Sequence, residues 1–190
     1  MLLDKEELLF IHIPKCAGRS VERYFEYKGR RHRTLDEYIK KEGERIESFF
    51  KFSFVRNPWD RMVSWYFAHK GEEYEPKTRE GFQDWIKGGL INHWIDKTID
   101  GVNWKNKDPL SMTEFLVTDK SVEFDYIGKV ENIEEDLKKI CSMKGIRSRA
   151  EILNIGKTKR EEYKYYYNDE CANIVKERFA EDLYNFDYKF

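Results

Sequence analysis

Two short runs of β-forming apolar residues constrain the fold of this chain more than any other feature. They span residues 8–13 and 50–55, and each ends abruptly at a turn. Apolar residues at helical spacing follow each turn, over residues 20–27 and 58–67. Because strands that alternate with helices usually pair in parallel, we predict an α/β fold with a mostly parallel central sheet flanked by helices.

The length and the composition of the chain fit one compact domain. The chain has 190 residues, of which 40% are hydrophobic and 16% aromatic, too many for a disordered chain. We therefore predict a single domain over residues 1–190. Glycines interrupt residues 71–111, where we expect an irregular or helical insertion of the kind that carries substrate specificity.

Cap residues predict where further helices begin. They are Thr34 with Glu37, Asn57 with Pro58, and Asn132 with Glu135. We also expect a strand within residues 122–130 and one final helix from about residue 170. The apolar face of that final helix would carry Val175, Phe179, Leu183 and Phe186.

The sequence argues against several classes of protein. Its apolar runs are far shorter than the roughly 20 residues of a membrane-spanning helix, and the charged residues before the first run are unlike a signal peptide. Three widely spaced cysteines argue against a disulfide framework or a zinc cluster. A net charge of -1, without a basic stripe, argues against nucleic acid as a partner. We expect a cytoplasmic protein with no integral membrane segment.

The turn after the first run has the features of a phosphate-binding loop. It leads into a helix start, where unpaired N–H groups and the positive end of the dipole attract anions. Against the ATP-binding pattern G-x-x-x-x-G-K-[ST], Gly18 and Ser20 match, whereas Ile13 and Arg19 depart from it. Lys15 instead lies inside the loop. We predict a P-loop-like phosphate-binding strand–turn–helix, although an ordinary turn with a surface lysine has the same pattern.

The second turn offers another anion site. Arg56 follows the second run directly, and Ser64 comes about two helical turns later. The planar, permanently charged guanidinium suits phosphate, and open α/β sheets bind ligands at the carboxyl ends of their strands. Taken alone, Ser64 could be an ordinary serine on a helix surface. Two anion sites at neighbouring strand ends suit a ligand that carries phosphate groups at two positions.

Residues 12–20 (HIPKCAGRS) and 54–66 (FVRNPWDRMVSWY) resemble the two nucleotide-binding motifs of sulfotransferases. The resemblance is to the carbohydrate sulfotransferases in particular, including the chondroitin and heparan 2-O types and their bacterial relatives. Residues 126–132 and 186–190 are also similar to this family. The two motifs in this order are far more specific than either alone.

This resemblance implies a donor, 3′-phosphoadenosine 5′-phosphosulfate, and a hydroxyl-bearing acceptor, a carbohydrate or another small molecule. No metal is expected, and the 71–111 insertion would lie near the acceptor. By motif, the groups that would hold the 5′-phosphosulfate are Lys15, Ala17, Gly18, Arg19 and Ser20. Arg56 and Ser64 would hold the 3′-phosphate. Lys15 would also stabilise the charge that develops on the leaving phosphate.

The acceptor hydroxyl needs a base, and histidine titrates in the useful range. His12 lies within the first predicted strand and is interpreted as structural. His69 is expected at a helix end, and His93 falls in the 71–111 stretch. His32 lies between the two motifs, similar in place to the base histidine of the heparan 2-O type, and is assigned as the base. It could also be one more residue of a basic loop, and Glu131 is the alternative base.

Two other functions remain open from the sequence. One is a nucleotide or small-molecule kinase built on the same kind of loop. Ile13 and Arg19, which replace the glycine and lysine of the ATP-binding pattern, argue against it. The other is a non-catalytic nucleotide-binding module.

Overall fold

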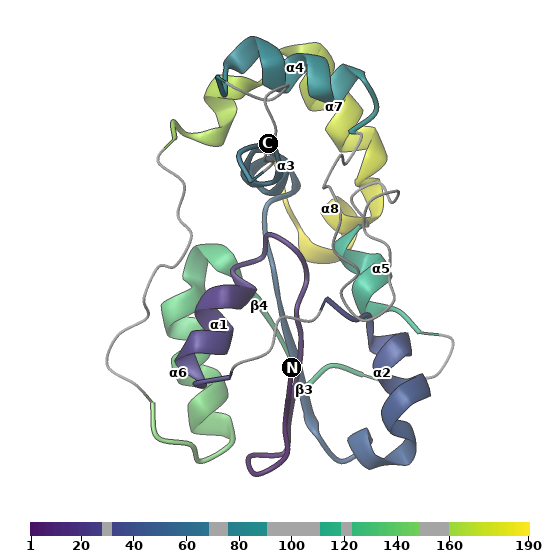
Figure 1. The fold of residues 1–190 in the computed structure, drawn as a ribbon, viewed down its shortest axis with the longest axis vertical. Coiled ribbons are helices and arrows are strands. Elements are labelled where there is room, and N and C mark those ends of the chain that lie inside the picture. Colours follow the sequence, from purple (N-terminus) through teal and green to yellow (C-terminus); the bar gives the residue numbers. More distant parts are fainter. Residues whose placement is uncertain (28–31, 69–75, 91–110, 119–122, 149–159) are drawn as a thin grey trace. The chain divides into compact units, whose positions relative to one another are not determined.

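A computed structural model describes residues 1–27, 32–68, 76–90, 111–118, 123–148 and 160–190 (Figure 1). These residues belong to two compact units. The sheet unit comprises Met1–Arg56 and Met112–Lys157, and the helical unit comprises Asn57–Ser111 and Thr158–Phe190. Each unit has its own hydrophobic core.

The sheet unit is built on a four-stranded sheet in the order β1-β2-β3-β4. Its strands are β1 (Leu2–Leu3), β2 (Leu8–Ile11), β3 (Phe50–Val55) and β4 (Tyr126–Lys129). The strands β2, β3 and β4 pair in parallel, and β1 is antiparallel to β2. All of β2 is buried, as expected for a parallel strand covered on both faces. The predicted, mostly parallel central sheet is therefore confirmed.

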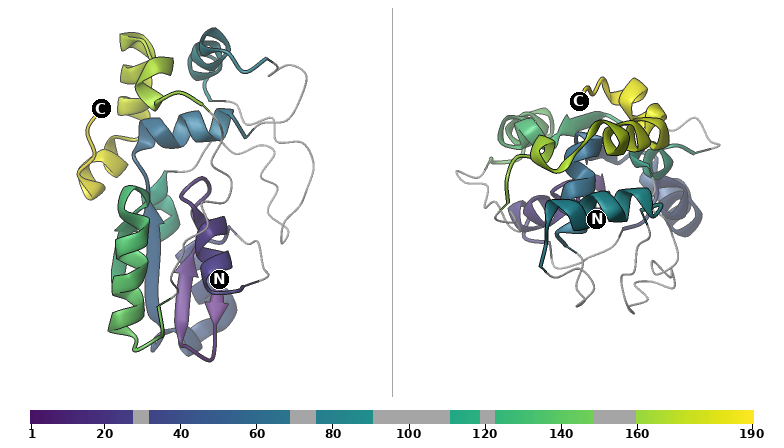
Figure 2. Two further views of the ribbon diagram at one scale, coloured as in Figure 1. Left: turned by 90° about the vertical axis from the view of Figure 1, so that its left-hand side faces the viewer. Right: turned by 90° about the horizontal axis from the view of Figure 1, so that it is seen from above.

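Helices cover both faces of this sheet. They are α1 (Gly18–Tyr24), α2 (Leu35–Glu42), α5 (Met112–Leu116) and α6 (Ile133–Met143), with the 3-10 turns η1 (Gly43–Ile46) and η4 (Val130–Asn132). Figures 1 and 2 show α1 and α6 on one face of the strands and α2 and α5 on the other. On the first face, Val21 of α1 and Leu137 of α6 pack with Phe52 of β3 in one core. The α/β fold predicted from the sequence is thus confirmed.

The predicted caps of this unit have different outcomes. The Thr34–Glu37 capping box forms, with both reciprocal hydrogen bonds. Asn132 lies at the N-cap position of α6, as predicted, but its side chain makes no cap hydrogen bond, so that part of the prediction was wrong. The 3-10 turn η4 runs directly into α6 and leaves Asn132 outside the extended conformation that a capping side chain needs. Asp136 instead accepts hydrogen bonds from the Lys129 N–H and the Tyr126 hydroxyl, both at 2.8 Å.

The helical unit contains α3 (Pro58–Tyr66), α4 (Arg79–Lys87), η5 (Tyr163–Tyr166), α7 (Asp169–Arg178) and α8 (Ala180–Phe186). The start of α3 is as predicted: the Asn57 side chain accepts from the Trp59 and Asp60 N–H groups, and Pro58 occupies the first turn. The core of the unit is rich in aromatic rings from α3, α4 and η5. In the residues that are described, no helix is both long and apolar enough to cross a membrane.

The prediction of a single final helix from about residue 170 was wrong. The chain forms α7 and α8, which meet at Phe179 in a non-helical conformation (φ -114°, ψ 29°). Glu181 and Asp182 lie in the first turn of α8, where the helix dipole favours acidic residues. This acidic pair marks a second helix start, which the apolar spacing conceals.

Within the 71–111 stretch, α4 is one of the short helices that were expected, and its Trp85 is buried. Residues 91–110 lie outside the described part of the chain. The prediction that this stretch is an insertion near the acceptor is therefore retained as a prediction.

Candidate functional site

The carboxyl edge of the sheet brings together the two predicted anion-binding turns. Because β2 and β3 are parallel and Ile11 pairs with Ser53, the chain leaves both strands at the same edge. There Arg56 Nη1 donates a hydrogen bond to the Lys15 carbonyl oxygen at 3.1 Å. Both residues are half-buried. The basic residue of the second turn thus contacts the backbone of the first.

Two residues of the first turn adopt the left-handed backbone conformation although neither is glycine. Lys15 has φ 67° and Ala17 has φ 55°. This conformation costs about 1–2 kcal/mol for each such residue. The turn is supported by the buried Cys16, whose N–H donates to the Ile13 carbonyl at 3.2 Å. Strained backbone of this kind is concentrated at binding and catalytic sites, so the turn is a candidate site by geometry as well as by motif.

The thioether of Met112 links this turn to the end of β3. Its sulfur accepts a hydrogen bond from the Arg56 N–H at 3.3 Å and lies 3.7 Å from the Cys16 sulfur. Met112 is the first residue of α5 and is fully buried. Met112, although distant in sequence, therefore contacts both turns. No local sequence pattern indicates this contact.

Position 18 requires glycine because its backbone lies directly against the ring of His12. A Cβ atom at Gly18 would lie 1.9 Å from His12 Cδ2 and 2.0 Å from His12 Nε2. The glycine therefore leaves room for the imidazole, whose exposed fraction is 4%. Beyond it on α1, Arg19 is exposed and Ser20 is buried. The first turn of α1 is in this way packed directly on His12.

His12 forms a buried pair with Glu22. His12 Nδ1 lies 2.9 Å from Glu22 Oε1, and both side chains are almost fully buried. Since a carboxylate only accepts, Nδ1 carries the proton. Burial, followed by the charges of the N-terminal ammonium and Lys15, lowers the pKa of His12 from 6.5 to about 3. His12 is therefore neutral near pH 7, and its burial fits its interpretation as a structural residue.

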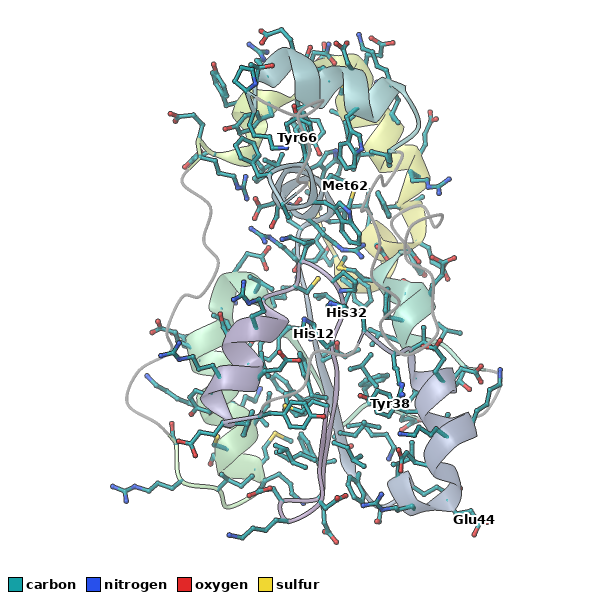
Figure 3. All side chains as sticks on the ribbon, in the orientation of Figure 1. His12, His32, Tyr38, Glu44, Met62 and Tyr66 are labelled. Atoms are coloured by element: carbon teal, nitrogen blue, oxygen red, sulfur yellow. The ribbon has the colours of Figure 1, made fainter. Side chains whose placement is uncertain are left out.

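His32 packs against His12, as Figure 3 shows. The two ring centroids are 4.2 Å apart, and His32 Nδ1 lies 3.0 Å from the His12 carbonyl oxygen. A carbonyl oxygen can only accept, so Nδ1 of His32 is protonated and the lone pair of the neutral ring is on Nε2. Burial, and next the charge of a protonated His12, lower the pKa of His32 to about 3. His32 is thus held in the neutral form that a general base requires.

The remaining predicted residues belong to other elements. Glu131 is exposed on η4, after β4. Because β4 is two strands from β2 in the sheet, the two strand ends are separated by roughly 10 Å. Ser64 is buried on α3 in the helical unit. His69 and His93 lie outside the described residues. In the described ranges no group of three or more His, Cys, Asp or Glu side chains is arranged to hold a metal ion.

Glu22 is the site residue that the sequence analysis missed. A weak signal was available, since Gly18 and Glu22 are four residues apart and lie on one helix face. Gly18 belongs to the motif, so this face had to approach the loop. The partner His12 could not be identified from spacing, because the contact joins a strand end to a helix.

These features define an α/β protein with a lysine, an arginine and neutral histidines at the carboxyl edge of a parallel sheet. The model of the sulfotransferase family matches residues 1–189, and the chain belongs to this family of sulfuryl-transferring enzymes. The match does not favour the kinase alternative. An uncharacterized protein of Archaeoglobus fulgidus is 29% identical over 102 residues, which are 53% of this chain and 72% of that protein. No solved structure matches the chain.

Proposed function

We propose that the protein transfers the sulfuryl group of 3′-phosphoadenosine 5′-phosphosulfate to a hydroxyl group of a carbohydrate or another small acceptor. The observation that carries this proposal is the hydrogen bond from Arg56 to the Lys15 carbonyl. It joins the charged residue of one nucleotide-binding motif to the other motif at a single edge of the sheet. Membership of the sulfotransferase family supplies the reaction class.

The donor would be held by both turns. Lys15 and the backbone of residues 17–20 would bind the 5′-phosphosulfate, and Arg56 with Ser64 would bind the 3′-phosphate. The residues present fit such a ligand, because a lysine and an arginine lie on adjoining turns and the left-handed backbone of the first turn favours a concave array of N–H groups. Charge-assisted hydrogen bonds to phosphate would supply much of the affinity.

In the proposed reaction the acceptor oxygen bonds to sulfur while the bond between sulfur and the phosphate oxygen breaks. The electron pair of that bond stays on the phosphate, and Lys15 stabilises the negative charge that develops there. The acceptor proton moves to Nε2 of His32, which is unprotonated in the tautomer set by the His12 carbonyl. Glu131 is the weaker candidate for this proton because it lies two strands away.

The acceptor class is inferred from the motifs and from the charge of residues that adjoin His32 in the sequence. Residues 28–33 are rich in lysine and arginine, which suits an acidic acceptor. Within this segment, the Arg33 guanidinium lies over the ring of Tyr38, 5.9 Å from its centroid. A carbohydrate that carries carboxylate or sulfate groups is therefore the first acceptor to test.

Thermal unfolding with adenosine 3′,5′-bisphosphate tests the donor assignment. At a ligand concentration a hundred times the Kd, we expect a rise in Tm of roughly 5–10 °C without Mg²⁺ and little response to ATP. Labelled donor, incubated with a panel of acidic and neutral saccharides, then tests transfer. A protein that responds to ATP with Mg²⁺ but not to the bisphosphate would contradict the proposal.

A further inference from the structure

The buried carboxylate of Glu22 is unexpected beside a site for an anionic donor. Glu22 lies on α1, four residues after Gly18, and its exposed fraction is 5%. Burying a charge is costly, and a negative charge at this place also repels phosphate groups. The hydrogen bond from His12 Nδ1 offsets part of this cost. A carboxylate kept here should therefore serve the reaction in another way than by binding the donor.

His12 lies between Glu22 and the proposed base and contacts both. The side chain of His12 donates to Glu22, and its backbone carbonyl accepts from His32 Nδ1. The two imidazoles are also packed edge to face, at an interplanar angle of 61°. Gly18 lies so close to the His12 ring that even one added carbon would overlap with it, and Phe10 stacks on the ring with the centroids 5.8 Å apart. His12 is consequently held by contacts on several sides, and it contacts His32.

We propose that Glu22 and His12 are positioning residues: His12 holds His32 in the tautomer with the lone pair on Nε2, and the Glu22 carboxylate is the counter-charge for the imidazolium that forms on proton transfer. This inference rests on the proposed function and deepens it. It adds an electrostatic role to two residues that would otherwise only support the fold.

The charges around His32 explain why a counter-charge is needed. Burial lowers the pKa of His32 most, and the charges of a protonated His12 and of Lys15 lower it further, whereas the hydrogen bond to the His12 carbonyl and then the carboxylate of Glu22 raise it. Without donor the balance leaves the pKa at about 3, far below the value that suits a base near pH 7. Removal of Glu22 would lower it further, and a bound donor, being anionic, would raise it. Glu22 and the donor therefore act in the same direction on His32.

The substitution Glu22→Gln separates charge from geometry, because its amide oxygen can still accept from His12 Nδ1. In NMR spectra of the intact protein at pH 7, we expect the His32 ring to be protonated on Nδ1 in both wild type and Glu22→Gln. The missing signals of His32→Gln provide the assignment. The acidic limb of the kcat–pH profile should move down by about one pH unit in Glu22→Gln, and the plateau should fall roughly threefold to tenfold. Glu44→Gln, which removes an exposed carboxylate of the same unit, should leave both unchanged.

Two results would overturn the inference. One is a wild-type His32 protonated on Nε2, a result that does not depend on the folding of Glu22→Gln. The other is a folded Glu22→Gln protein whose kcat and pH profile equal those of Glu44→Gln. Failure of the proposed function is distinguishable, because it appears as a wild-type protein that neither binds adenosine 3′,5′-bisphosphate nor transfers sulfuryl groups, whatever the tautomer of His32.

Discussion

The substitution Gly18→Ala tests the packing on which the site depends. The new Cβ atom would lie 1.9 Å from His12 Cδ2, about 1.5 Å short of ordinary van der Waals contact at 3.4 Å. The His12 ring cannot yield by that amount and keep its bond to Glu22, because the present 2.9 Å separation would exceed hydrogen-bond range. We therefore expect either a displaced His12 or a displaced first turn of α1.

The expected loss of stability follows from three contributions. Overpacking of a buried site costs about 1–3 kcal/mol, and a buried carboxylate that loses its donor costs about 1–3 kcal/mol more. Alanine is favoured over glycine in a helix by roughly 0.5–1 kcal/mol, which opposes the loss. The net destabilisation is about 1–5 kcal/mol, which for a chain of this length lowers the Tm by roughly 2–20 °C.

Thermal and urea unfolding measure this loss, and a double-mutant cycle assigns its cause. In a His12→Ala background the ring is absent, so Gly18→Ala should cost less than about 0.5 kcal/mol, a coupling of at least about 0.5 kcal/mol. Gly88→Ala is a matched control, since its Cβ would lie no closer than 3.2 Å to another atom. The reasoning would be refuted by a Gly18→Ala protein with the Tm of wild type. It would also be refuted if the losses of unfolding free energy from Gly18→Ala and His12→Ala were additive.

Three further predictions concern the charged groups of the site. Arg56→Ala should weaken binding of adenosine 3′,5′-bisphosphate about tenfold to a hundredfold in calorimetric titration, and an unchanged Kd would contradict its role. Lys15→Ala should lower kcat more than it raises KM, because the charge it stabilises develops in the transition state; loss of donor affinity alone would make it an anchor. Since the pKa values of His12 and His32 are about 3 when folded, against 6.5 when unfolded, stability is full above pH 6.5 and falls toward pH 3. At pH 5 the loss should be about 2 kcal/mol for each histidine, and urea unfolding at pH 7 and 5 should show a smaller acid loss in His32→Gln.

The strands and several helix starts were predictable because their signals are local. The strand at Phe50–Val55 and the Thr34 capping box both depend on residues within a few positions of one another. The break at Phe179 was not predictable from apolar spacing, because the same spacing continues through both helices. Asn132 failed as a cap because the preceding 3-10 turn fixed its backbone.

The basic residues of the candidate site, Lys15 and Arg56, were predictable from the sequence, whereas the carboxylate of Glu22 was not. Parallel strands end at one edge, so the approach of Arg56 to Lys15 followed from the fold class. The pairing of His12 with Glu22 depends on how α1 packs over the strand end, a tertiary contact that no spacing specifies. The same holds for Met112, which reaches the turns from a segment far along the chain.

The packing of Gly18 on His12 also limits how such an enzyme can be redesigned or can diverge. Gly18 accommodates the ring of His12, and His12 contacts both Glu22 and His32. A substitution of His32, the proposed base, therefore alters the surroundings of the proposed donor loop, and a substitution in this loop alters the surroundings of His32. Variants designed for new acceptors should keep these four residues together and change the segments around them. Libraries that randomise the four positions independently should yield mostly inactive proteins.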